Sequence, residues 1–106
     1  MMPPHIKDID PLPGNSLTTG AITVFGYSLR YAAPPEVVDE SDGSVVETRV
    51  DIDVKQVGRG VGDPHAPAGS IQEETVLRVI IPGFRAGHAY RLSFCDGVFR
   101  YPAPQP

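Results

Sequence analysis

The chain lacks tryptophan and has a single cysteine, Cys95, among its 106 residues. One thiol excludes an internal disulfide bond and a four-cysteine zinc site. An antibody-type domain, in which a cysteine pair packs on a tryptophan, is excluded for the same reason. The fold must therefore be held together by packing alone.

Basic residues are few and scattered, with nine Lys and Arg against thirteen Asp and Glu and a formal net charge of -4. Nucleic acids and anionic membranes require clustered basic side chains. No run approaches the roughly 20 apolar residues of a membrane span. Charged Lys7, Asp8 and Asp10 stand where a signal peptide would need an apolar core. We expect a free-standing protein made in the cytoplasm, with no nucleic-acid or membrane partner; an engineered start at Met1 is the alternative.

Turn-forming residues are abundant instead. Twelve prolines and eleven glycines make up about a fifth of the chain, nearly twice the usual share of roughly 12%. They separate short apolar runs, which predicts many short strands and turns. The length predicts one domain. We assign 1–3 to an N-terminal arm, 4–101 to the domain and 102–106 to a Pro-rich tail.

Strand periodicity is clearest over 46–54, where one face is apolar or β-branched and the other is charged. This alternation is typical of an antiparallel sheet with one packed face and one solvated face. The apolar face contains Val46, Thr48, Val50, Ile52 and Val54, and the charged face contains Glu47, Arg49, Asp51 and Asp53.

Further strands are predicted at 5–9, 21–25, 75–81, 88–95 and 98–101, because these apolar runs are bounded by turn residues. Asp96-Gly97 predicts a two-residue type I′ hairpin turn. The 31–44 segment predicts a connection with a short edge strand near Val37-Val38. The 58–70 segment is a predicted loop, and no window predicts a helix. About seven short strands favour a sandwich.

Two terminal patterns point to one kind of sandwich. Residues 4–14 follow P-x-I-x-x-I-x-P-x-x-G, and 20–29 are similar to a G-x-x-I-x-I-x-G-x-x-L strand. Segments 4–29 and 81–92 resemble immunoglobulin-like domains of the IPT/TIG type. The resemblance implies a single immunoglobulin-like all-β sandwich with extended Pro-rich termini. That family includes receptors, accessory modules of enzymes, transcription factors and virion proteins, and it transfers no catalytic residue.

Three patterns could carry chemistry, but each is better interpreted as ordinary structure. Gly58 to Gly62 is a glycine-rich run, yet neither Lys-Ser/Thr nor a helix follows it as in a phosphate-binding loop. The three histidines, His5, His65 and His88, lack metal-ligand spacing, even with Asp63 nearby. The acidic turn at 39–43 has no D-x-D-x-D-G calcium loop. We expect no metal and no cofactor.

Cys95 at a strand end is interpreted as a structural thiol, and no Ser-His-Asp or paired-carboxylate arrangement stands out. We therefore expect a protein that is not an enzyme. Exposed aromatic and arginine side chains are common interface anchors, whereas buried ones would simply fill a core without tryptophan. The interface candidates are Tyr27, Leu29, Arg30, Tyr31, Phe84, Phe99 and Tyr101.

The first functional hypothesis is a non-enzymatic structural or binding module. It would be a subunit of a larger assembly such as a phage capsid decoration or tail accessory protein, with capsid, tail or other subunits, including copies of itself, as partners. The alternative is a carbohydrate- or cell-surface-binding module whose aromatic side chains stack on sugars. The third is a small enzyme using the loops at 31–44 and 58–70, which clustering of Asp63, His65 and His88 would support.

Overall fold

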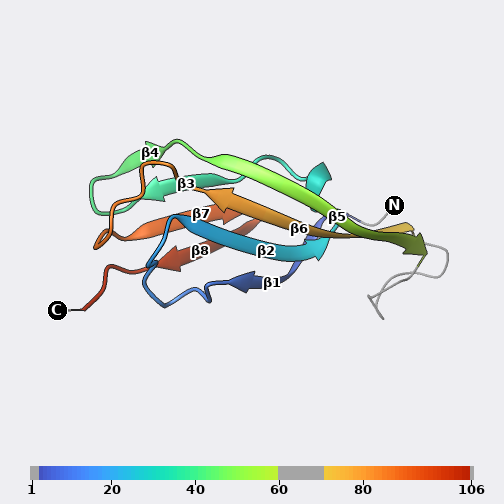
Figure 1. Ribbon diagram of the computed structural model, residues 1–106, viewed down its shortest axis with the longest axis horizontal. Helices are drawn as coiled ribbons and strands as arrows, with labels where there is room; N and C mark the ends of the chain where they lie inside the picture. The colour runs from blue at the N-terminus through green and yellow to red at the C-terminus, as the bar shows by residue number, and fades with distance from the viewer. Residues whose placement is uncertain (1–2, 60–70, 106) are drawn as a thin grey trace.

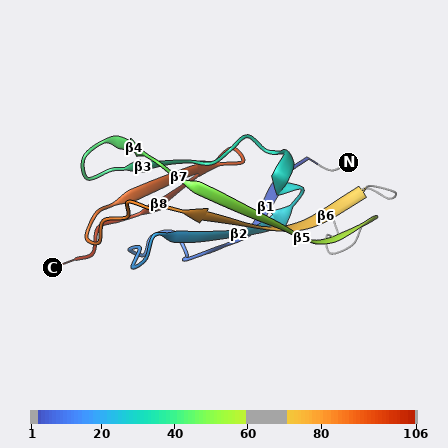
Figure 2. The ribbon, with the colours of Figure 1, turned by 45° about the horizontal axis from the view of Figure 1, so that its top comes forward.

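The computed structural model describes residues 3–59 and 71–105. These residues form two four-stranded antiparallel sheets that face each other as a β-sandwich (Figures 1 and 2). The first sheet has the order β1-β2-β6-β5, and the second has the order β4-β3-β7-β8. The all-β sandwich is confirmed, with eight described strands where about seven were predicted.

The first sheet contains the longest strands. Its members are β1 (His5–Asp10), β2 (Ala21–Tyr27), β5 (Arg49–Arg59) and β6 (Ile71–Ile80). The second sheet is built from shorter strands, β3 (Glu36–Asp39), β4 (Ser44–Val46), β7 (Tyr90–Phe94) and β8 (Gly97–Tyr101). The β5–β6 hairpin therefore reaches past the end of the second sheet, as Figure 1 shows at its right side.

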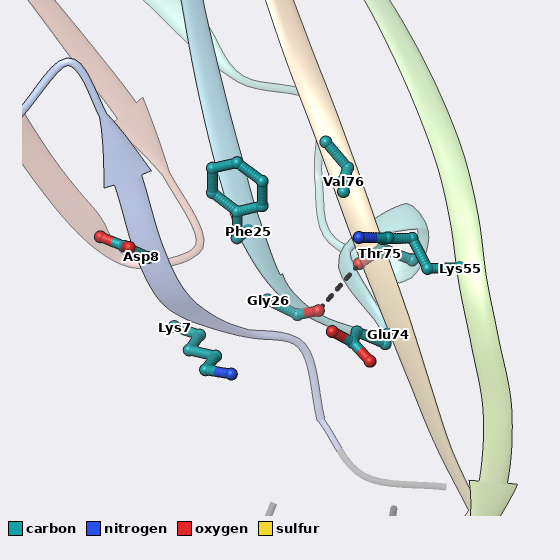
Figure 3. A pocket seen from close by; sticks show the side chains of 8 residues that line it. All are labelled: Lys7, Asp8, Phe25, Gly26, Lys55, Glu74, Thr75 and Val76. Atoms are coloured by element: carbon teal, nitrogen blue, oxygen red, sulfur yellow. Dashed lines mark hydrogen bonds between the residues drawn. The ribbon is translucent and has the colours of Figure 1, made fainter. Parts of the chain in front are cut away.

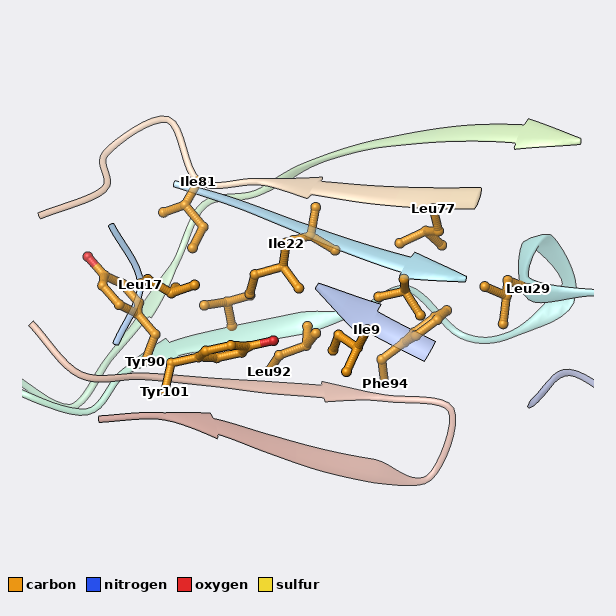
Figure 4. Close-up of a cluster of buried hydrophobic side chains, with 13 residues drawn as sticks. Ile9, Leu17, Ile22, Leu29, Leu77, Ile81, Tyr90, Leu92, Phe94 and Tyr101 are labelled. Carbon is orange, nitrogen blue, oxygen red and sulfur yellow. The ribbon is translucent and has the colours of Figure 1, made fainter. Parts of the chain in front are cut away.

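The hydrophobic core lies between the two sheets, where inward side chains of both sheets meet (Figure 4). Tyr90 and Tyr101 are its largest fully buried residues. Both hydroxyls are hydrogen-bonded, as a buried phenol requires. The Tyr101 hydroxyl donates to the Pro11 carbonyl at 2.6 Å, and the Arg85 amide donates to the Tyr90 hydroxyl at 2.8 Å.

The alternating 46–54 run is not one strand. Its first residue ends β4 in the second sheet, and from Arg49 onward it forms β5 in the first sheet. Glu47 and Thr48 connect the sheets. Alternation continues across this crossover because the inner face of each strand points into the same sandwich.

Three other expectations need correction. The strand at Val37-Val38 is β3, which lies between β4 and β7 instead of at an edge. The predicted loop at 58–70 begins later, because β5 continues to Arg59; its remainder, 60–70, lies outside the described residues. A single 3₁₀ turn, η1 (Leu29–Tyr31), follows β2 among the described residues.

The β7–β8 hairpin is confirmed, but its turn is one residue earlier than predicted. Phe94 pairs with Gly97, so the central residues are Cys95 and Asp96. Their φ values are 55° and 62°, and a type I′ turn requires positive φ at both central positions. Gly97 instead lies against the Phe99 ring, which is 2.8 Å from where a Cβ would be.

Candidate functional site

Strand β5 forms an edge of the first sheet, and its inner face is the most exposed apolar strip in the described part of the chain. Val50, Ile52 and Val54 point inward but retain 36%, 45% and 38% exposure. Their cross-strand neighbours on β6 are Val79, Leu77 and Thr75, which are at most 1% exposed. The strip was predicted to be packed, and the structure leaves it half open.

The opposite face of β5 is fully charged. Arg49, Asp51, Asp53 and Lys55 are all exposed. Asp51 lies opposite Arg78 of β6, whereas Asp53 lies opposite Val76. The strand thus presents an apolar row on one face, a charged row on the other, and along its outer edge the backbone groups that β6 does not pair.

The other three sheet edges are shorter or interrupted. Strand β1 has a register shift between Ile6 and Asp8, β4 is three residues long, and β8 is five residues long. Short strands and bulges are the usual protection against unwanted strand pairing. Strand β5 has regular pairing over 49–54 before a register shift between Val54 and Gln56. It is the longest regular edge that the described residues present.

A groove of about 230 Å³ continues the apolar strip towards the second sheet. Val50 and Ile52 form one wall, Pro34 and Pro35 form the other, and Phe94 contributes to the lining. Strand β4, which forms the edge of the second sheet next to β3, is only three residues long and ends at Val46. Pro35 precedes β3 and has no amide hydrogen to offer a neighbouring strand.

A second depression, of about 210 Å³, lies on the outer face of the first sheet (Figure 3). Lys7 and Lys55 stand around it with Asp8 and Glu74, and Phe25 forms part of its lining. Its surroundings therefore carry both signs of charge. No described group there combines the nucleophile, base and orienting partner of a catalytic site.

The acidic turn at 39–43 meets a histidine that sequence spacing did not link to it. Asp39, Asp42 and His88 offer ligand atoms within 4.8 Å of one another. The buried Asp39 carboxylate accepts from the Ser41 amide at 2.9 Å and lies 2.7 Å from His88 Nδ1. These contacts tie the β3–β4 turn to the entry of β7, which is a structural role.

The third member of that cluster is also engaged. Asp42 accepts from the Ser44 hydroxyl at 2.6 Å and from the Ser44 amide at 2.9 Å. These hydrogen bonds are the main cause that lowers its pKa. Arg85 Nη1 lies 3.4 Å from the same carboxylate and supplies a positive charge. Asp39, Asp42 and His88 therefore each have a hydrogen-bond or ion-pair partner within the chain. His65 and Asp63, which were to test the enzyme hypothesis, lie outside the described residues.

The predicted interface residues fall into three groups. Tyr27, Leu29 and Tyr101 are 3%, 1% and 1% exposed and are core residues, not surface residues of this chain. Phe84 and Phe99 are partly buried and pack against the core, with the Phe84 ring stacked on Tyr90 at 5.4 Å. Their sequence positions near predicted strand ends and turns suggested exposure. In the structure Phe84 lies in the β6–β7 connection and Phe99 is the middle residue of β8.

Arg30 and Tyr31 are the predicted interface residues that lie at the surface. Arg30 stacks over the Tyr31 ring at 4.9 Å, donates to its hydroxyl at 2.8 Å and pairs with buried Glu73 at 2.8 Å. Arg30 and Tyr31 therefore belong to η1, which packs against the first half of β6 around Glu73 and Thr75. Tyr31 is 49% exposed.

Cys95 is half-buried at the β7–β8 turn, and desolvation raises the pKa of its thiol. A raised pKa disfavours the thiolate, which is the reactive form. The position therefore matches the structural interpretation of this cysteine.

No family model, no curated protein and no solved structure matches this chain. Among the described residues, no helix is long and apolar enough to cross a membrane.

The residues that sequence reasoning missed are Val50, Ile52 and Val54. Their alternation predicted a strand with an apolar face, and the strand is there. Whether that face is covered depends on strands of the other sheet, which no local pattern encodes. The sequence signal for an uncovered face was the length of the alternating 46–54 run, which is longer than the strands predicted to face it.

Proposed function

We propose that this chain is a non-enzymatic immunoglobulin-like module that acts as a subunit of a larger assembly and docks through the exposed inner face of β5. The observation that carries the proposal is the apolar strip of Val50, Ile52 and Val54 on a long regular edge. Half-exposed β-branched residues beside an apolar groove are typical of a surface that a protein partner covers.

The immunoglobulin-like assignment is supported by strand order. When the eight strands are lettered along the chain as A, B, C, C′, D, E, F and G, the first sheet has the order A-B-E-D and the second has the order C′-C-F-G. These are the sheet orders of immunoglobulin-like domains. Tyr90 begins the strand equivalent to F, and its hydroxyl accepts from the Arg85 amide five residues upstream. A tyrosine at that corner with a hydrogen bond to upstream backbone is a recurrent feature of these sandwiches.

The assembly that the sequence favours is a phage virion, in which the chain would decorate a capsid or serve as a tail accessory protein. The carbohydrate-binding alternative has weaker support. Of the aromatic residues proposed for stacking, only Tyr31 is exposed, and it is already engaged with Arg30. A sugar-binding surface usually needs a free aromatic face.

Site-specific cross-linking tests the proposal. A photo-reactive phenylalanine derivative is placed at Ile52 in the full chain, expressed in the cells in which the protein is naturally made. The matched control is Val98, which is 57% exposed on β8. We expect a discrete adduct from position 52, identified by mass spectrometry as a protein that co-sediments with the chain. Equal yields from both positions, or no adduct from position 52, would contradict the proposal.

A further inference from the structure

The charged face of the edge strand β5 can oppose Arg to Asp when a second copy of the strand runs beside it in the opposite direction. Its outer face reads Arg49, Asp51, Asp53 from the start of the strand, with Val50 and Ile52 between them on the inner face. Antiparallel neighbours place directly opposed residues on the same face, so a second copy can pair only in registers that preserve parity.

We infer that two copies of this chain pair antiparallel through β5, around a two-fold axis at Asp51, and so join their first sheets into one continuous sheet. The inference rests on the proposed function and names its partner as a second copy. In this register Arg49 faces Asp53 of the second copy, and Val50 faces Ile52 of the second copy. Each contact occurs twice because the interface is symmetric.

The one like-charge contact in this register falls on the axis, where Asp51 faces Asp51 of the second copy. Arg78 is the cross-strand neighbour of Asp51 on β6. Across the joined sheet, the two Asp51 carboxylates therefore lie between Arg78 and Arg78 of the second copy. This row tolerates the central pair, because each carboxylate has a cation on its other side.

Neighbouring registers fit less well. An axis at Ile52 would oppose Asp51 to Asp53 and Arg49 to Lys55, so every charged pair would repel. An axis at Val50 leaves only Arg49 to Asp51 within the strand, because β5 begins at Arg49. An axis at Asp53 would pair Asp51 with Lys55, which lies at the register shift between Val54 and Gln56. The Asp51 axis uses the longest regular part of the edge with opposite charges opposed.

Charge exchange tests the register directly. Arg49→Asp and Asp53→Arg each create two repulsive contacts, whereas the double variant restores opposite charges in reversed order. Both substituted positions are exposed, and circular dichroism of all three variants checks that the fold is kept. In sedimentation equilibrium of the full chain, we expect each single variant to raise the dimer dissociation constant about tenfold or more and the double variant to recover most of the loss.

Cross-linking at the axis gives an independent readout. In a Cys95→Ser background, Asp51→Cys places its thiol opposite its own symmetry mate. Directly opposed antiparallel residues have Cα atoms about 4.5 to 5.5 Å apart, within disulfide reach. We expect a disulfide-linked dimer on mild oxidation. The control, Asp53→Cys in the same background, faces Arg49 of the second copy and should form at least about tenfold less dimer.

The outcomes separate this inference from the proposed function. A chain that stays monomeric at roughly 1 mM overturns the self-pairing. So does a dimer that is insensitive to the single charge reversals or not rescued by the double variant. If position 52 nevertheless cross-links to a different protein, the docking face stands and only the second copy as partner fails.

Discussion

Strands β5 and β6 lie side by side in the same sheet and both direct apolar side chains inward, but these side chains have different environments. The inner face of β6 is buried, with Leu77 at 1% and Val79 at 0% exposure. The inner face of β5 is half-exposed at the directly opposed Ile52 and Val50. The difference arises because the second sheet covers β6, whereas short β4 leaves most of β5 open.

The inner face of β6 therefore stabilises the domain itself, whereas the inner face of β5 is accessible from outside. Burial contributes roughly 25 cal/mol per Å² of apolar area, so equal side chains on the two strands contribute unequally to folding. Substitutions at opposed positions can measure that inequality directly.

The largest difference is expected between Leu77→Ala and Ile52→Ala. Leu77 is fully enclosed, so truncation leaves a cavity and should lower the free energy of unfolding by about 2 to 5 kcal/mol. Ile52 faces solvent across nearly half of its surface, so its truncation should cost under about 1.5 kcal/mol. Urea unfolding of each variant gives both values. Equal losses would show that the β5 face is covered within the single chain.

A shape-conserving exchange at the next opposed pair sharpens the comparison. The Thr75 hydroxyl accepts from the Leu29 amide at 3.1 Å and donates to the Gly26 carbonyl at 3.3 Å. Thr75→Val would leave both buried groups without this partner and should cost about 1 to 3 kcal/mol. Val54→Thr, at the opposed position on β5, should change stability by less than about 0.5 kcal/mol. A near-neutral Thr75→Val in thermal unfolding would contradict the hydrogen-bond argument.

Burial also predicts an alkaline limit to stability. Desolvation raises the pKa of Tyr101 to about 12, against roughly 10 for a free tyrosine. Between these pH values the unfolded chain loses the proton and the folded chain keeps it, so stability falls as pH rises. We expect a loss of about 1 to 2 kcal/mol between pH 10 and 12 from this group. Denaturant titrations across that range should show a shallower slope for Tyr101→Phe, and an unchanged slope would refute the assignment.

The smallest effect is expected at a surface ion pair. Arg85 and Asp42 are 64% and 39% exposed and 3.4 Å apart. Exposed pairs of this kind contribute little to stability, because water and salt screen the attraction. Arg85→Gln should therefore leave the urea midpoint nearly unchanged, in contrast to any change at Leu77. A large loss would mean that the Asp39, Asp42 and His88 cluster depends on the Arg85 charge.

Local patterns predicted much of the secondary structure. Apolar runs bounded by turn residues placed the strands at 5–9 and 21–25 close to their observed bounds, whereas the strand predicted at 75–81 begins four residues earlier, at Ile71. The β7–β8 turn was predicted one residue too late, at Asp96-Gly97, because Gly97 was expected to be one of the two residues with positive φ. Proline pairs suggested an edge near Val37, yet β3 is interior, since β4 pairs beyond it.

The candidate site was less predictable. Two of the proposed anchors, Tyr27 at the end of β2 and Leu29 at the start of η1, are buried. No sequence period indicated the short turn of η1. Asp39 and His88 are 49 residues apart, so their contact follows from the pairing of β3 with β7. Spacing rules for metal ligands detect only short-range arrangements and therefore did not find it.

The sequence by itself determined that this protein is a strand-rich domain without an internal disulfide bond, and it determined which side chains of the 46–54 run face inward. Those properties are local, because side chains alternate along every extended segment. Only the tertiary structure decided that the 46–54 run crosses between sheets and that the inward face of β5 lacks a cover. Coverage is a long-range property, since it depends on the lengths of strands that come together from distant parts of the chain.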